Sequence, residues 1–92
     1  MINFKQQELV EKISAAVKER FPEVEFINVT EGPEDPADLW LNVIAPENED
    51  REMAFRDFTS ELTSDILLEY GYLILVMPRS EQEAAFMNGF AS

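Results

Sequence analysis

The chain has 92 residues, of which 19 are acidic and 7 basic, so its formal net charge is −12, and it contains no cysteine and no histidine. Its length predicts a single domain over residues 1–92, and the missing residue types exclude thiol nucleophiles, thiolate metal sites and histidine-based acid–base chemistry. The acidity argues against nucleic acid and anionic membranes as partners, because both are bound through clustered Lys and Arg. We therefore expect a non-catalytic protein without a cofactor. Because no signal peptide or membrane-spanning run is recognisable, we also expect it to be soluble and cytoplasmic.

The first element in chain order is an amphipathic helix over residues 3–20. Asn3 is a suitable N-cap, and Gln6 stands three residues later, as in a capping box. Pro22 cannot continue the helix, so we expect the helix to end before it. The apolar stripe of this helix consists of Leu9, Val10, Ile13, Ala16, Val17 and Phe21.

Two strands follow, over residues 24–30 and 38–45. The apolar side chains of the first strand change face part-way along it, which is typical of a bulge or of a strand covered on both faces. The loop over residues 31–37 holds two prolines and a glycine, and its length predicts an antiparallel hairpin. In the second strand one face carries Leu39, Leu41 and Val43, and the other carries Trp40 and Ile44.

The longest element is a helix over residues 49–70. Asn48 can cap its N-terminus, and acidic residues fill its first turn, where negative charge stabilises the helix dipole. Gly71 is suited to the left-handed conformation that often ends a helix. A helix between two strands predicts a right-handed crossover, which makes the third strand parallel to the second. The apolar stripe consists of Phe55, Phe58, Leu62, Ile66 and Tyr70.

The third strand is predicted over residues 72–77, which form an uninterrupted apolar run. Because polar and apolar residues do not alternate in this run, we expect the strand to be buried on both faces. Pro78 is expected to end it. Ser80 and Glu83 then match a capping box, which predicts a short final helix.

These elements predict an α+β fold in the order αββαβα, built as a two-layer or three-layer sandwich around a small mixed three-stranded sheet. The strand order is either 1-2-3 or 2-1-3, and both orders leave residues 72–77 at an edge. An apolar edge strand without an internal charge or proline is a template for pairing with another chain. We therefore expect a homodimer, or pairing with a protein partner, in which Trp40 packs rather than binds a ligand. The expected interface residues are Trp40, Tyr72, Ile74 and Leu75.

Acidic residues gather in and beside the hairpin loop, where Asp35 and Asp38 are the candidates for binding a cation. Carboxylate oxygens are the ligands that Mg²⁺ and Ca²⁺ prefer. The spacing does not match a calcium loop of the EF-hand type, which needs alternate oxygen ligands and a central glycine in a geometry that the prolines prevent. We therefore expect a solvated loop without a metal site.

The stretch Asp38-Leu39-Trp40-Leu41-Asn42-Val43-Ile44, with the element order over residues 24–77, resembles the minimal nucleotidyltransferase-like domain. In that family two carboxylates one residue apart on this strand bind Mg²⁺ for attack on a nucleoside triphosphate. Asp38 matches the first carboxylate, Trp40 stands in place of the second, and Phe26-Ile27 stands where the family has Gly-Ser. The resemblance implies a degenerate domain with residual nucleotide or Mg²⁺ binding and without transfer activity.

Three functions are therefore compared. The first is a small acidic interaction or regulatory domain that is not catalytic and acts as a homodimer. The second is the degenerate nucleotidyltransferase-like domain, which carboxylates gathered in a cleft would favour. The third is an acidic decoy that presents carboxylates to a basic protein as DNA presents phosphates, which carboxylates spread along a ridge would favour.

Overall fold

The computed structural model describes residues 3–32, 34, 35 and 37–89. Within them the elements follow the predicted order αββαβα, which confirms the α+β fold and its small mixed three-stranded sheet. The elements are α1 (Phe4–Arg20), β1 (Glu25–Glu31), β2 (Leu39–Ile44), α2 (Glu49–Tyr70), β3 (Ile74–Arg79) and α3 (Glu81–Gly89).

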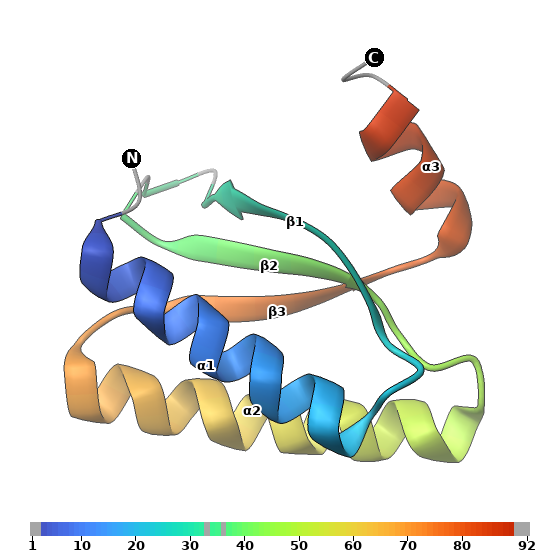
Figure 1. Ribbon diagram of the computed structural model, residues 1–92, viewed down its shortest axis with the longest axis horizontal. Coiled ribbons are helices and arrows are strands. Elements are labelled where there is room, and N and C mark those ends of the chain that lie inside the picture. The colour runs from blue at the N-terminus through green and yellow to red at the C-terminus, as the bar shows by residue number, and fades with distance from the viewer. Residues whose placement is uncertain (1–2, 33, 36, 90–92) are drawn as a thin grey trace.

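The helices are distributed unequally over the two faces of the sheet. Helices α1 and α2 lie side by side under one face, and α3 stands at one end of the opposite side (Figure 1). Within the described residues, the helices therefore leave most of the second face uncovered. In the described part of the chain, no helix is both long enough and apolar enough to cross a membrane.

The helix ends are set by the capping residues that the sequence predicts. Asn3 Oδ1 accepts a hydrogen bond from the backbone of Gln6 at 2.7 Å, and Gln6 Oε1 accepts one from the backbone of Asn3 at 3.1 Å, which completes the capping box of α1. Asn48 Oδ1 accepts from the Arg51 backbone at 3.0 Å at the start of α2. Gly71 ends α2 with φ +76°, in the left-handed region that was predicted for it.

The sheet has the order β1-β2-β3, one of the two orders predicted, with β3 at an edge. Strands β1 and β2 form the expected antiparallel hairpin, and their register shifts between Phe26 and Asn28, which confirms a bulge in β1. Strand β3 runs parallel to β2, as a crossover through α2 requires.

The core lies between the sheet and the pair α1 and α2. Phe21, just past the end of α1, meets Phe55 of α2 edge to face, with ring centroids 5.4 Å apart. Among the described residues, the buried members of this cluster come from α1, α2, the sheet or the segments that join them: Leu9, Ile13, Val17, Phe21, Val24, Leu39, Leu41, Val43, Phe55, Ile66 and Ile74.

Two expectations for the third strand are wrong. The strand spans Ile74–Arg79 instead of residues 72–77, so it includes both a proline and a charge. It is also not buried on both faces: Ile74 is fully buried, but the other strand residues are only half-buried. There are two physical reasons. Helices α1 and α2 cover one face and leave the other to the first turns of α3, and β3 lies at the edge of the sheet.

Pro78 is tolerated inside β3 because its nitrogen faces away from β2. Leu39 donates its backbone N–H to Leu73 O at 3.0 Å, and Leu39 is the register partner of Ile74. In a parallel ladder only alternate residues bond to a given neighbour. Residues 73, 75 and 77 therefore use their backbone groups on β2, and Ile74, Val76 and Pro78 direct theirs outward, so no ladder bond needs the missing N–H.

Candidate interaction surface

The side chains of β2 and β3 separate into two sets. Leu39, Leu41 and Val43 face α1 and α2, together with Ile74 and Val76 of the neighbouring strand. The other set faces away from these helices. It consists of three register pairs, which are Trp40 with Leu75, Asn42 with Met77, and Ile44 with Arg79. We call this second set the outer face of the sheet.

The outer face is apolar at four of its six positions. Trp40 and Leu75 lie next to each other across the ladder, and Ile44 and Met77 extend the surface toward the ends of the strands. All four side chains are half-buried. A single tryptophan beside three aliphatic or thioether side chains gives the composition that is typical of the centre of a protein interface.

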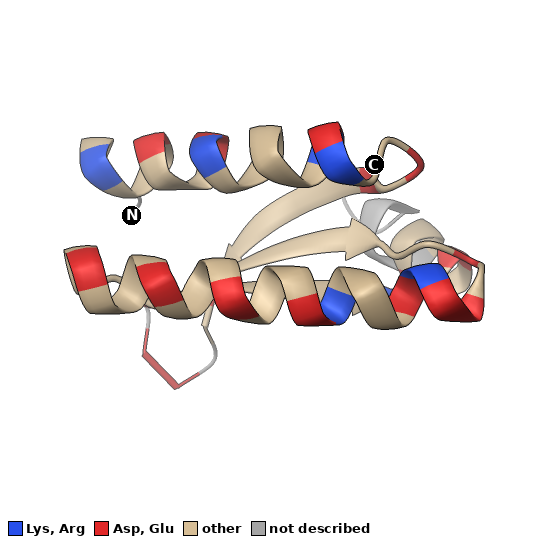
Figure 2. Cartoon of the chain, turned by 90° about the horizontal axis from the view of Figure 1, so that it is seen from below, with Lys and Arg blue, Asp and Glu red and all other residues tan. Residues whose placement is uncertain are grey.

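Charge is concentrated elsewhere on the molecule. No Asp, Glu, Lys or Arg occurs in residues 39–46 or 70–78. Acidic and basic residues instead follow one another along α1 and α2 on the side that faces away from the sheet (Figure 2). A chain with net charge −12 thus has an uncharged strip along two neighbouring strands, formed by residues 39–46 and 70–78, and Arg79 of the outer face lies just beyond it.

A buried asparagine forms the polar centre of the outer face. Asn42 is fully buried, and its side-chain amide donates to Asn28 Oδ1 at 2.9 Å and to Thr30 Oγ1 at 3.0 Å. Arg79 donates from Nε to Asn42 Oδ1 at 3.1 Å, and its guanidinium lies 5.7 Å from the centre of the Trp40 ring. These contacts join all three strands and fix the orientation of the Arg79 side chain beside Trp40.

The N-terminus of α3 is held at one end of the outer face by contacts of Arg79, Ser80 and Glu83. Arg79 Nη1 lies 3.7 Å from Glu83 Oε2, and Glu83 and Ser80 complete the predicted capping box with two hydrogen bonds of 3.1 Å. Ala84 is buried, with 4% of its surface exposed. The first turn of α3 therefore covers the end of the outer face that Arg79 occupies.

The four expected interface residues are not brought together. Trp40 and Leu75 are adjacent on the outer face, but Ile74 is fully buried on the helix side and cannot present a surface. Tyr72 is half-buried against the core, and its hydroxyl accepts a hydrogen bond from Asn3 Nδ2 at 3.4 Å. Ile44 lies on the same face as Trp40, as the sequence predicts. Other members of the face were missed, although their alternation with Trp40 and Leu75 along the strands could have revealed them: Asn42, Met77 and Arg79.

The candidate cation residues of the hairpin loop serve a turn. Asp35 Oδ1 accepts a hydrogen bond from the Ala37 backbone at 2.9 Å. The backbone N–H of Asp38 donates to Asp35 O at 3.0 Å, and the carbonyl oxygen of Asp38 accepts a hydrogen bond from the backbone N–H of Gly32 at 2.7 Å. Among the described residues, no three or more acidic side chains gather in a way that could hold a metal ion.

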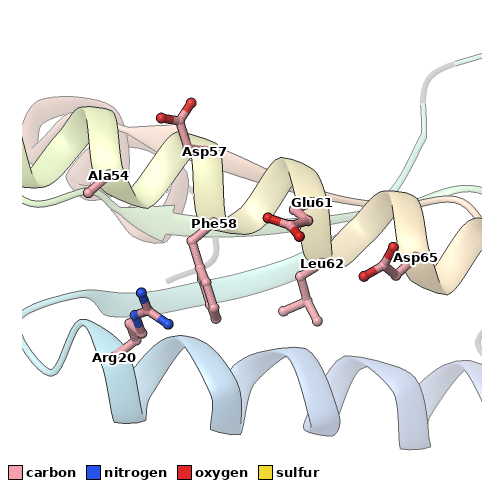
Figure 3. Close-up of a pocket in the computed structure, with 7 residues that line it drawn as sticks. All are labelled: Arg20, Ala54, Asp57, Phe58, Glu61, Leu62 and Asp65. Carbon is pink, nitrogen blue, oxygen red and sulfur yellow. The ribbon is translucent and has the colours of Figure 1, made fainter.

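A shallow groove runs between α1 and α2 on the opposite side of the molecule. It encloses about 510 Å³ and is lined by Arg20, Ala54, Asp57, Phe58, Glu61, Leu62 and Asp65. Phe58 and Leu62 point from α2 toward α1, Arg20 reaches toward Phe58, and Asp57 points away from α1 (Figure 3). The three acidic residues are four positions apart, which puts a carboxylate about every 6 Å along the helix axis.

One ion pair shifts the ionisation of its members. Arg51 donates to both carboxylate oxygens of Glu23, from Nε at 2.8 Å and from Nη2 at 3.0 Å. These hydrogen bonds hold the pKa of Glu23 below its ordinary value, and the same bonds raise the pKa of Arg51. The pair joins the segment between α1 and β1 to the start of α2 and lies at the surface.

Comparisons of the chain with protein-family models, curated proteins and solved structures gave no match.

Proposed function

We propose that the protein is a small interaction domain that acts as a homodimer, with the uncharged strip of β2 and β3 as its contact surface. The observation that carries this proposal is that Trp40 and Leu75 pair within a strip that contains no Asp or Glu, whereas acidic residues follow one another along α1 and α2 (Figure 2). Two copies that each carry a charge of −12 repel one another. They can associate with the least repulsion where carboxylates are missing and apolar side chains can be buried.

The size of the molecule is compatible with such an interface. A standard protein interface buries about 600–1,000 Å² on each partner. The accessible surface of the chain is 6128 Å², so the interface would take about a tenth to a sixth of it. The outer face together with the free edge of β3 offers a continuous region for this contact.

The molar mass in solution tests the proposal. Light scattering at tens of micromolar protein is expected to give about twice the chain mass of 10.6 kDa. Leu75→Glu places a charge in the strip and is expected to yield monomers, whereas Leu68→Glu is the matched control because Leu68 of α2 is 86% exposed away from the strip. Circular dichroism of both variants reports whether the fold persists. A wild-type mass near 10.6 kDa contradicts the proposal.

A second function, the acidic decoy, is favoured by one observation. Asp57, Glu61 and Asp65 form a row along α2 at one side of the groove between α1 and α2, and Figure 2 shows acidic residues along the length of this helix. Such a row presents regularly spaced negative charge to a basic surface.

The decoy is tested with an arginine-rich peptide as the probe. Tight binding that weakens steeply between about 0.05 and 0.2 M salt is expected, because the contacts are ionic. Asp57→Asn with Glu61→Gln should weaken binding more than the same charge change at Glu8 and Glu11 of α1. Equal losses in the two double variants would show attraction to net charge alone and rule out the decoy.

A further inference from the structure

The free edge of β3 has a defined pattern of backbone groups. Ile74 and Val76 each direct an N–H and a C=O away from β2, whereas Pro78 offers only a C=O. In the described part of the chain, no backbone hydrogen bond joins this edge to another element. Strand β1 forms the other edge, where two glutamates and a bulge oppose strand addition.

We propose that the β3 edges of two copies pair antiparallel about a twofold axis that passes through Leu75, so that the two sheets form one sheet of six strands. This inference rests on the proposed homodimer and specifies its geometry. In this register Ile74 faces Val76 of the partner subunit, and Val76 faces the partner's Ile74. Each pair exchanges two backbone hydrogen bonds, since both residues direct their groups outward.

Pro78 selects this register over its neighbour. If the axis passed through Val76, Pro78 of one copy would face the partner's Ile74. Because proline has no N–H, the Ile74 carbonyl of each copy would lose its donor inside the interface. With the axis at Leu75, Pro78 instead faces the partner's Tyr72 at the margin of the paired segment, where water can reach the unpaired group.

The side chains beside the edge fit the same arrangement. Leu75 of each copy would lie opposite its twin on the outer face, which extends the contact between Trp40 and Leu75 across both subunits. The flank of α2 next to β3 is marked by Arg56, which shares a surface cavity with Pro78 and Arg79. Leu67 lies on the same flank three turns later and is 41% exposed, so an added strand would cover it.

Engineered cysteines test the register, because the chain has none of its own. In the proposed pairing the two Leu75 residues form a non-hydrogen-bonded pair with Cα atoms about 4.5 Å apart, within the range for a disulfide. Leu75→Cys is therefore expected to give a disulfide-linked dimer on mild oxidation. Met77→Cys is the matched control on the same strand and face, since its two copies would be about 13 Å apart and should not cross-link.

A mixture of two variants makes the test specific for antiparallel pairing. Leu73 faces the partner's Met77 in this register, so Leu73→Cys and Met77→Cys should cross-link to each other when mixed, and neither should cross-link alone. Val76→Pro removes an outward N–H that the ladder with β2 does not use. It is expected to abolish the dimer and keep the circular dichroism spectrum, whereas Val76→Ala should leave the dimer intact.

The possible failures are distinguishable. A dimeric mass without cross-linking of Leu75→Cys overturns the strand pairing and leaves the homodimer in place. Two results overturn the register in favour of another contact of the outer faces. One is that Met77→Cys on its own cross-links as well as Leu75→Cys, and the other is that the mixture of Leu73→Cys and Met77→Cys gives no cross-linked product. A monomeric mass for the wild type overturns the proposed function and this inference together.

Discussion

Arg79 donates a hydrogen bond from Nε to Oδ1 of Asn42 at 3.1 Å, and the two residues come from neighbouring strands of the parallel pair. Asn42 is fully buried, and its amide donates in turn to Asn28 and Thr30 of β1. A polar residue at such a position is stable only when its groups are paired, because water cannot replace a lost partner. The contact between Arg79 and Asn42 therefore links the residues just before α3 to β2 and, through the Asn42 amide, to β1.

Asn42→Ala is expected to lower the free energy of unfolding by about 1–3 kcal/mol, because it removes a buried amide together with its hydrogen bonds to Asn28, Thr30 and Arg79. Asn28→Ala is the control. Asn28 is exposed, and its loss leaves the Asn42 amide with Thr30, so a decrease of about 0.5–1.5 kcal/mol is expected. Urea denaturation of both variants measures the difference. Equal decreases in the free energy of unfolding for the two variants would show that the burial of Asn42 does not add to its contribution.

Gly71→Ala is expected to destabilise the protein by about 1–2 kcal/mol, because an L-residue with a Cβ is strained in the left-handed region. Gly71 has φ +76°, and a Cβ there would meet no atom within 4 Å, so the cost would come from the backbone alone. Gly71→Asn should lose less, since asparagine adopts this conformation more readily. Thermal unfolding measures both variants, and an unchanged midpoint for Gly71→Ala would contradict the argument.

Local chemistry predicted most of the fold. The capping residues Asn3, Asn48 and Ser80 and the glycine at position 71 identify the helix ends, because each satisfies groups that a helix leaves unpaired. The third strand was placed two residues too early, since Pro78 was read as a terminator. Whether proline ends a strand depends on which way its nitrogen faces, and only the pairing with β2 decides that.

The candidate surface was predicted less completely. Trp40 and Leu75, which the sequence predicts as contact residues, lie next to each other on the outer face, but a continuous apolar run does not tell which of its members face the helices. Ile74 and Leu75 are equally apolar neighbours, and the one-residue offset between them puts the first in the core and the second on the outer face. The sequence already places Ile44 with Trp40, and once β2 is known to pair with β3 the same alternation adds Met77.

Glu23→Gln is expected to lower stability at neutral pH and to have little effect in acid. The pKa of Glu23 is lowered in the folded state by the hydrogen bonds from Arg51, so folding favours the carboxylate. The ion pair therefore adds stability above the pKa that Glu23 has in the unfolded chain. This stability is lost as the pH falls through the lower pKa that Glu23 has in the folded protein. Denaturation midpoints at about pH 7 and pH 3 compare the variant with the wild type.

Glu11→Gln on the outer side of α1 is the control for that experiment, because it changes the net charge equally. Its effect on the midpoint at neutral pH should be smaller than that of Glu23→Gln. A gap between wild type and Glu23→Gln that is as large in acid as at neutral pH would contradict the role of the pair.

Added salt is expected to stabilise the fold. Even if all seven basic residues were paired, twelve of the nineteen acidic residues would keep an uncompensated charge. Raising sodium chloride from about 0.03 to 0.3 M shortens the screening length from about 17 to about 6 Å, which weakens the repulsion between carboxylates on α1, α2 and the loops. Salt also weakens surface pairs such as Arg79–Glu83, but these contribute little on average.

Urea midpoints at fixed protein concentration should therefore rise with salt, and less so when Asp57→Asn, Glu61→Gln and Asp65→Asn are combined. A lower midpoint in 0.3 M salt would show that the ion pairs outweigh the repulsion.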